Sequence, residues 1–243
     1  LKSNHPSLLV VVTSRLRSLS RRLAIRHTMS RWIKTDPRVH LLFALGDGSD
    51  LSAQMEAEAF GDILLLELRD TYDNLTNKTF SILRWAENVI NYIEFLMKID
   101  DDSFVQFDRL LRMLLSLKRK YLYVGHIFTN SRVIKDKNFK YFELDYEGQY
   151  YPPYASGSGY VISSSLITKI NNNEAPVRLR NEDVSVGASI NSLDVSVKMY
   201  HSSLFFPEGS MKCVVDAYLL HRQSIQSFYT YFSNLTQHGV ICS

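Results

Sequence analysis

Three adjacent aspartates, Asp100-Asp101-Asp102, are the clearest chemical feature of the sequence. They follow an apolar run over residues 93–99, which has the length and composition of a buried strand. Adjacent carboxylates repel one another unless a cation lies near them, and hard divalent ions such as Mg²⁺ and Mn²⁺ prefer oxygen ligands. Because side chains alternate along a strand, the first and third carboxylates can face the same side. The triplet is therefore a candidate metal site, with a solvated turn that caps the next helix as the alternative.

A second acidic pair, Glu182-Asp183, comes directly before an apolar segment that begins at Val184. Acidic residues are common at helix starts, where they cap the helix and interact favourably with its dipole. A carboxylate held at a helix start inside a cleft can also accept a proton from a hydroxyl group. From these residues alone, the structural role is favoured and a general base is the alternative.

The stretch from Tyr154 to Tyr160 contains Gly157 and Gly159, and we expect it to form a loop. Glycine permits close approach of the backbone to a ligand, and tyrosine offers both a flat face and a hydroxyl group to a sugar. A tight turn between strands is the alternative. His221 follows another apolar stretch, where a structural histidine is favoured over a metal ligand.

The composition indicates a globular chain that can position these residues. The sequence has 243 residues, of which 45% are hydrophobic and 22% are charged, and this excludes a disordered or fibrous protein. A net charge of +3 gives no argument for a nucleic-acid surface. Six arginines near the N-terminus suggest a local anionic ligand, with a solvated helix face as the alternative: Arg15, Arg17, Arg21, Arg22, Arg26 and Arg31.

Strand-like and helix-like segments alternate along the chain. The pattern predicts strands over residues 8–13, 39–45, 62–68, 93–99 and 121–124. It predicts helices over 18–32, 51–60, 74–91, 107–117, 161–170 and 184–190. Such alternation is typical of a single α/β domain with a mostly parallel sheet, in which ligands bind at the carboxyl ends of the strands.

Several motifs occur in order along the chain: Arg21-Arg22-x-x-Ile25-Arg26-x-Thr28, Asp70-x-Tyr72-x-Asn74-Leu75-Thr76-x-Lys78, Trp85, Lys98-x-Asp100-Asp101-Asp102-Ser103-Phe104, Tyr154-x-x-Gly157-x-Gly159-Tyr160 and Glu182-Asp183-Val184-x-x-Gly187. Together they resemble the β-1,3-glycosyltransferase family, which contains β-1,3-galactosyltransferases, related N-acetylglucosaminyltransferases and fringe proteins. The resemblance extends from Leu8 to Cys242. The stretches 68–76, 182–188 and 219–224 are most similar to the branch that builds the glycosaminoglycan–protein linker.

The resemblance implies a GT-A-type nucleotide-sugar-binding fold with a twisted, mostly parallel sheet flanked by helices. Residues 1–243 form one catalytic domain, with 1–110 mainly binding the nucleotide sugar and 111–243 mainly binding the acceptor and catalysing transfer. The implied metal is Mn²⁺, with Mg²⁺ as the alternative. Asp102 and His221 are its implied ligands, and Asp100 lies beside them, more toward the ribose.

The remaining implied roles concern the two substrates. Asp183 is the implied catalytic base. Donor-binding residues are implied at Arg22, Arg26, Asp70, Lys78, Asp100 and Asp101. The sugar and acceptor pocket is implied at Tyr154, Gly157, Gly159 and Glu182.

The resemblance implies inverting transfer of galactose from UDP-galactose to the 3-hydroxyl of a β-linked galactose on a proteoglycan core protein. Alternatives are an N-acetylglucosaminyl- or galactosyltransferase acting on another glycan, a non-catalytic carbohydrate-binding protein and, least favoured, a hydrolase. We expect a Golgi membrane protein with a lumenal catalytic domain and an N-terminal anchor outside these residues, and no nucleic-acid partner. We also predict a Cys213–Cys242 disulfide, a capping role for Asn74 and Asn234 as the better glycosylation candidate.

Overall fold

The strand β1 (Leu8–Thr13) is completely buried, as its unbroken apolar, β-branched sequence predicts. In the computed structural model, which describes residues 7–117, 119–144, 146–208 and 214–242, β1 lies inside a seven-stranded sheet of order β3-β2-β1-β4-β7-β6-β8. The other strands are β2 (Val39–Leu45), β3 (Ile63–Leu65), β4 (Phe95–Asp100), β6 (Leu122–Phe128), β7 (Tyr154–Ser163) and β8 (Lys198–His201).

The sheet is mostly parallel. β3, β2, β1 and β4 pair in parallel, as do β6 and β8, whereas β7 runs antiparallel to both of its neighbours. Strands from both halves of the chain therefore join one sheet. This arrangement, with helices on both faces, confirms the predicted α/β architecture.

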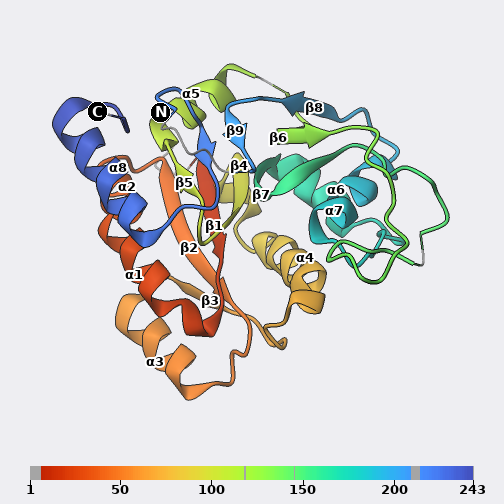
Figure 1. The fold of residues 1–243 in the computed structure, drawn as a ribbon, viewed down its shortest axis with the longest axis horizontal. Coiled ribbons are helices and arrows are strands. Elements are labelled where there is room, and N and C mark those ends of the chain that lie inside the picture. Colours follow the sequence, from red (N-terminus) through yellow and green to blue (C-terminus); the bar gives the residue numbers. More distant parts are fainter. Residues whose placement is uncertain (1–6, 118, 145, 209–213, 243) are drawn as a thin grey trace.

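Alternation along β1 divides the core into two layers. Leu8, Val10 and Val12 pack toward α1 (Leu19–His27), α2 (Met29–Ile33), α5 (Phe107–Ser116) and α8 (Ile225–His238). Leu9 and Val11 pack toward α4 (Leu75–Ala86), α6 (Ser164–Asn171) and α7 (Glu182–Asn191). Figure 1 shows α1, α2 and α8 on one side of the sheet and α4, α6 and α7 on the other, with α3 (Leu51–Phe60) at the tip beside β3.

A second, three-stranded sheet lies beside the end of β4. It consists of β5 (Phe104–Val105), β9 (Phe205–Phe206) and β10 (Leu219–Leu220), with β10 in the middle. β10 pairs antiparallel with β5 and parallel with β9. These short strands come directly after the aspartate triplet and directly before His221, so they determine where both lie.

The strands predicted over 8–13 and 39–45 and the helix predicted over 51–60 are confirmed residue for residue. The single helix predicted over 18–32 is wrong, because α1 ends and α2 begins on either side of Thr28. The Thr28 hydroxyl donates to the carbonyl of Ala24 at 2.6 Å, a contact that competes with regular helix geometry. The helix predicted over 74–91 ends at Ala86, and only Ile63–Leu65 of the strand predicted over 62–68 is extended and paired.

The predicted loop from Tyr154 to Tyr160 is also wrong, because these residues lie in β7, a ten-residue strand inside the sheet. Its glycines serve close packing instead of a turn. A Cβ on Gly159 would lie 2.3 Å from Cδ1 of Leu219 in the small sheet. The glycine at position 159 of β7 therefore allows the two sheets to pack closely against each other.

No helix in the described parts of the chain combines the length and the apolar character needed to cross a bilayer.

Candidate active site

The two sheets bring together the three residues predicted to hold a metal. β4 ends at Asp100, Asp102 follows in the turn to β5, and His221 comes directly after β10. One ligand atom from each of Asp100, Asp102 and His221 lies within 4.8 Å of the others. Two carboxylates and an imidazole form a mixed oxygen and nitrogen donor set that fits a divalent metal ion.

Hydrogen bonds orient the metal-site carboxylates. Nδ1 of His221 lies 3.0 Å from Oδ1 of Asp102 and 3.0 Å from the Ser103 hydroxyl. Burial of Asp102 would raise its pKa, but the hydrogen bond and charge of His221 outweigh burial, and the pKa of Asp102 lies below its ordinary value. Asp102 is therefore ionised and available as a ligand at neutral pH.

The carboxylate of Asp101 makes contacts different from those of the candidate metal ligands. Its carboxylate accepts a hydrogen bond from the Ser14 hydroxyl at 2.7 Å and lies 3.9 Å from Nε of Arg21. Burial raises the pKa of Asp101 above its ordinary value. The side chain thus connects the aspartate turn to the segment after β1, which agrees with a place on the donor side.

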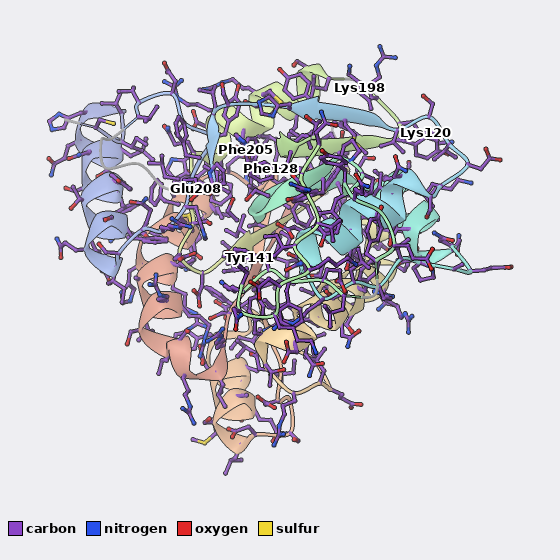
Figure 2. The ribbon with its side chains drawn as sticks, turned by 45° about the vertical axis from the view of Figure 1, so that its right-hand side comes forward. Lys120, Phe128, Tyr141, Lys198, Phe205 and Glu208 are labelled. Atoms are coloured by element: carbon purple, nitrogen blue, oxygen red, sulfur yellow. The ribbon has the colours of Figure 1, made fainter. Side chains whose placement is uncertain are left out.

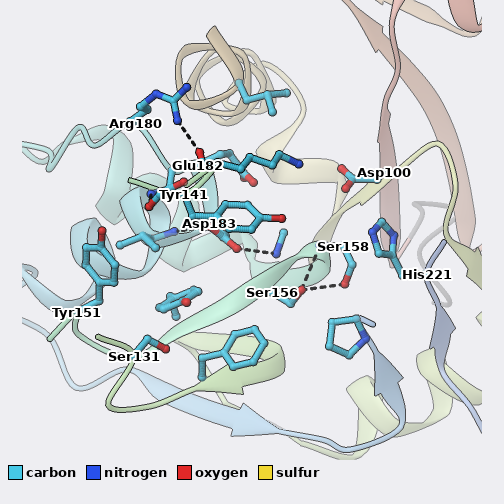
Figure 3. A pocket seen from close by; sticks show the side chains of 18 of the residues that line it. Asp100, Ser131, Tyr141, Tyr151, Ser156, Ser158, Arg180, Glu182, Asp183 and His221 are labelled. Carbon is cyan, nitrogen blue, oxygen red and sulfur yellow. Dashed lines mark hydrogen bonds between the residues drawn. The ribbon is translucent and has the colours of Figure 1, made fainter. Parts of the chain in front are cut away.

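The candidate metal ligands lie between two cavities. The larger, of about 550 Å³, and the smaller, of about 400 Å³, share Asp100 and His221, together with Tyr72, Leu75 and Lys140. Figure 3 shows Asp100 and His221 on one side of the larger cavity, with Glu182 and Asp183 across from them. A ligand at the junction can therefore contact groups of both cavities.

Asp183 lies in the wall of the larger cavity, in the first turn of α7. Its carboxylate accepts hydrogen bonds from the backbone N–H groups of Gly157, at 3.1 Å, and Val184, at 2.9 Å. Burial, followed by the neighbouring charge of Glu182, raises the pKa of Asp183 to about 6. A half-buried carboxylate with this pKa, held rigidly in a cavity, can accept a proton near neutral pH.

Glu182 lies beside Asp183 but its oxygens are already engaged. Oε1 accepts hydrogen bonds from the hydroxyls of Tyr160, at 2.6 Å, and Thr79, at 3.0 Å, and Oε2 lies 3.4 Å from Nζ of Lys98. The side chain is only 8% exposed. These contacts hold the carboxylate of Glu182 in place. Glu182 also lines the larger cavity, so its predicted contact with the acceptor stays a prediction.

The other predicted sugar-pocket residues differ in whether they reach the larger cavity. Tyr154 and Gly157 line the larger cavity, whereas Gly159 does not and packs against Leu219. Gly187, in the same motif as Asp183, is needed because a Cβ there would lie 2.3 Å from Cβ of Tyr154. This close approach of α7 to β7 holds the start of α7 against the cavity.

Four of the six predicted donor residues line the smaller cavity: Asp70, Lys78, Asp100 and Asp101. The amino group of Lys78 is buried and contacts both carboxylate oxygens of Asp70 at 3.0 Å and the carbonyl of Ser14 at 2.7 Å. Burial lowers the pKa of Lys78 despite the charge of Asp70. This pair closes one wall of the cavity.

Arg22 and Arg26 do not reach either cavity. Arg22 is fully buried, donates to both oxygens of Glu56 and also holds the Ser14 hydroxyl. Arg26 pairs with Glu56 and Asp62 and lies over the rings of Phe43 and Phe60. Both arginines therefore hold α1, α3 and the segment after β1 together instead of facing a phosphate.

The arginines that do line the smaller cavity are Arg15 and Arg21, which the sequence shows only as members of the basic cluster. The sequence analysis does not indicate Lys140 or Tyr141 as site residues, and it includes Tyr72 only as part of the Asp70-x-Tyr72 motif. Lys140 lies over the rings of Tyr72 and Tyr141, at 4.9 and 5.1 Å from their centroids, and lines both cavities. The interleaving of basic and aromatic residues over 132–142 is a sequence signal that could have indicated Lys140 and Tyr141.

The three remaining predictions concern residues away from the cavities. Cys213 lies outside the described residues, so the disulfide with Cys242 stays a prediction. Asn234 lies within α8 and its amide donates to the carbonyl of Ile241 at 3.0 Å. Asn74 precedes α4 as predicted, but its amide donates to the carbonyl of Arg69 and makes no capping hydrogen bond.

Comparison with known proteins gives the family to which this fold and candidate site belong. A galactosyltransferase family model matches residues 20–201, and the chain belongs to that family. It is 33% identical over 215 residues to β-1,3-galactosyltransferase 5 of Pan troglodytes, covering 84% of this chain and 72% of the relative. It is 32% identical over 252 residues to β-1,3-galactosyltransferase 6 of Mus musculus, covering 97% and 75%.

Among solved structures, a glycosyltransferase involved in the glycosylation of the major capsid of PBCV-1 matches with a TM-score of 0.49 at 12% identity, over 94% of this chain and 99% of that chain.

Proposed function

We propose that this chain is an inverting, metal-dependent β-1,3-galactosyltransferase that moves galactose from UDP-galactose to the 3-hydroxyl of a β-linked galactose in the glycosaminoglycan–protein linker. The observation that carries the proposal is the position of Asp183, whose carboxylate lines the larger cavity across from Asp100 and His221. The family membership and the similarity to β-1,3-galactosyltransferases 5 and 6 support the reaction class and the sugar. The Golgi lumen, implied by the family resemblance, belongs to the same proposal.

In this proposal the smaller cavity binds the donor. Arg15, Arg21 and Lys140 line it and are available to the diphosphate. Asp102, His221 and Asp100 would hold Mn²⁺, which offsets the negative charge on the departing UDP when it is bound. The donor sugar then extends across the junction into the larger cavity.

Asp183 acts on the acceptor. Its carboxylate accepts the proton of the acceptor 3-hydroxyl as that oxygen attacks the anomeric carbon from the face opposite UDP. The new oxygen–carbon bond forms while the carbon–oxygen bond to UDP breaks, so one displacement converts an α-linked donor to a β-linked product. The hydrogen bonds from Gly157 and Val184 hold the carboxylate in place for this transfer. Tyr154 and Tyr151, which also line this cavity, offer ring faces to the acceptor sugar.

The test is transfer by the purified protein. The protein, with Mn²⁺, is incubated with a β-galactosyl-xyloside or a β-N-acetylglucosaminide acceptor, in separate reactions with labelled UDP-galactose, UDP-N-acetylglucosamine and UDP-N-acetylgalactosamine. The linkage of each product is determined by NMR. We expect a β-1,3-linked galactosyl product with UDP-galactose. Transfer of N-acetylglucosamine alone would contradict the donor, and transfer only to a β-N-acetylglucosaminide acceptor would contradict the linker substrate.

A further inference from the structure

Lys98 is a buried cation between the candidate metal ligands and Asp183. The residue is only 3% exposed. Its amino group donates to Oδ1 of Asp100 at 2.8 Å and to the carbonyl of Gly157 at 2.6 Å, and lies 3.4 Å from Oε2 of Glu182. An ammonium group has three N–H donors, so these three acceptors satisfy it completely. Burial lowers the pKa of Lys98, but the charges of Asp100 and Glu182 outweigh burial and raise it, so the side chain is charged.

The sheet places Lys98 where its amino group can contact both Asp100 and the start of α7. Lys98 and Asp100 are two residues apart on β4 and therefore lie on the same face. Lys98 lies directly opposite Tyr160 of β7 in the antiparallel register. The Tyr160 hydroxyl donates to Oε1 of Glu182 at 2.6 Å, so neighbouring residues of two strands hold the two oxygens of one carboxylate.

The same contacts fix Asp183, which follows Glu182 in α7. Gly157 accepts from Lys98 through its carbonyl and donates to Oδ2 of Asp183 through its N–H. A Cβ at Gly157 would lie 3.2 Å from Oε2 of Glu182 and 3.5 Å from Oδ2 of Asp183, so both carboxylates lie close to the backbone of Gly157. Both routes from Lys98 to Asp183, through Glu182 and through Gly157, are therefore short and buried.

We propose that Lys98 and Glu182 are a pair of positioning residues: their buried ion pair ties the metal-binding end of β4 to the start of α7 and so sets the position of the base relative to the metal. Glu182 in this assignment touches no substrate. The inference rests on the proposed function, because it takes Asp183 as the base and Asp100 as part of the metal site.

The charges around Asp183 give this pair a distinctive signature. Lys98 on β4 favours the ionised carboxylate, whereas Glu182 on α7 disfavours it. The other ionisable groups near Asp183 are Arg180 in the same cavity wall, Asp100 beyond Lys98, and a set of tyrosines: Tyr72, Tyr123, Tyr151, Tyr154 and Tyr160. Removing Lys98 or Glu182 must therefore shift the titration of Asp183 in opposite directions.

The test compares Lys98→Met, Glu182→Gln and the double variant with the unaltered protein. The pH at which kcat/KM falls on the acid side of the profile reports the ionisation of Asp183. We expect this pH to rise by about one pH unit in Lys98→Met and to fall by about one pH unit in Glu182→Gln. In the double variant, which lacks both charges, this pH returns close to its original value. We also expect kcat in Lys98→Met to fall at least about tenfold, with a smaller change in KM for the donor. Shifts in the same direction, or no shift in either single variant, would overturn the proposal.

Two further variants separate positioning from folding. Lys198→Met removes an exposed lysine of β8, on the outer edge of the sheet, and serves as the matched control with an unchanged profile (Figure 2). Tyr160→Phe removes one hydrogen bond to Glu182 without changing charge, so it should lower kcat while leaving the acid side of the profile in place. Lys98→Met leaves the buried carboxylate of Glu182 without its cation and is the variant most at risk of not folding. If it does not fold, the double variant and Glu182→Gln still give the comparison, because the double variant lacks both charges and Lys98 keeps Asp100 as a counter-ion in Glu182→Gln.

A readout without turnover keeps this inference separate from the proposed function. Carbon-13 NMR of the aspartate carboxyl groups, with the Asp183 signal assigned by its loss in Asp183→Asn, follows the titration of Asp183 directly. If the protein transfers none of the three sugars, the proposed function fails, and the NMR titrations still decide whether Lys98 and Glu182 act on Asp183 with opposite sign. Unchanged titration in both variants refutes the inference even when transfer is normal.

Discussion

Nδ1 of His221 lies 3.0 Å from Oδ1 of Asp102 because two very short strands pair beside them. Leu220, directly before His221, lies opposite Phe104 in antiparallel register, and Asp102 is two residues before Phe104. The backbone N–H of Gln223 also donates to the carbonyl of Asp102 at 2.8 Å. The contact thus depends on regular pairing in the small sheet, and this gives both side chains a fixed place at the end of β4.

Replacement of His221 by alanine should weaken Mn²⁺ binding at least about tenfold, because one ligand is lost and the carboxylate of Asp102 loses its hydrogen-bond partner. Isothermal titration with Mn²⁺ in the presence of UDP measures the affinity. His40→Ala, which removes an exposed histidine from β2, is the control and should bind as the unaltered protein does. Equal affinity in His221→Ala and His40→Ala would show that His221 is not a ligand.

The elements that could be predicted from the sequence are those whose local pattern agrees with their final environment. The run over 8–13 is apolar and β-branched and is buried on both faces, so composition sufficed. Residues 154–160 carry the opposite signal, because glycine and serine are poor strand formers. They form a strand since Gly159 must lie against Leu219, a contact between segments far apart in the chain that no local pattern contains.

Some site residues can likewise be predicted from local sequence, whereas others depend on contacts between segments far apart in the chain. Asp100, Asp102 and Asp183 are indicated by their places at a strand end and a helix start, and the motifs of the family resemblance added His221. Which arginine faces the cavity could not be predicted, because it depends on the break at Thr28 and on the position of Glu56 in α3. Glu56 attracts Arg22 into the interior, so Arg21 remains for the cavity.

Transfer should require an ionised Asp183. Since the pKa of Asp183 is raised to about 6, kcat/KM should fall about tenfold for each pH unit below that value and level off above it. Asp183→Asn should abolish transfer while UDP binding, which we propose for the other cavity, stays close to normal. Initial rates over about pH 5 to about pH 8, with Asp194→Asn as an exposed control, check both expectations. Near-normal transfer by Asp183→Asn would assign the base to another group.

The same carboxylate should make the folded protein less stable as the pH rises. A raised pKa means that, between about pH 4 and about pH 6, folded Asp183 holds a proton that the unfolded chain has released, so this group's contribution to stability falls through that window. Above about pH 6 the raised pKa of Asp183 lowers the free energy of unfolding by its full amount, at most about 3 kcal/mol. Asp183→Asn removes the charge and should raise Tm by a few degrees at pH about 8 and leave it nearly unchanged at pH about 4. Thermal unfolding followed by circular dichroism at both pH values measures this, and a Tm lowered equally at both would contradict the cause given.

Arg21 and Arg22 are neighbours in the sequence and should give opposite results when each is replaced by alanine. Arg21 is about one-third exposed, lines the smaller cavity and lies 3.9 Å from Asp101, so its loss should raise KM for the UDP-sugar several-fold with Tm nearly unchanged. Arg22 is fully buried against Glu56, so its loss leaves a buried carboxylate with one arginine fewer and should reduce the free energy of unfolding by about 3 kcal/mol or more.

Steady-state kinetics and urea unfolding on both variants separate the two roles. Because Arg26 still pairs with Glu56 in Arg22→Ala, the buried carboxylate keeps one cation and the variant should retain part of its stability. A raised KM in Arg22→Ala at unchanged stability would mean that Arg22, and not Arg21, faces the donor. That outcome would require α1 to turn about its axis in the donor complex, because in this structure the guanidinium of Arg22 is enclosed by Glu56, Ser14 and the carbonyls of Arg15 and Leu16.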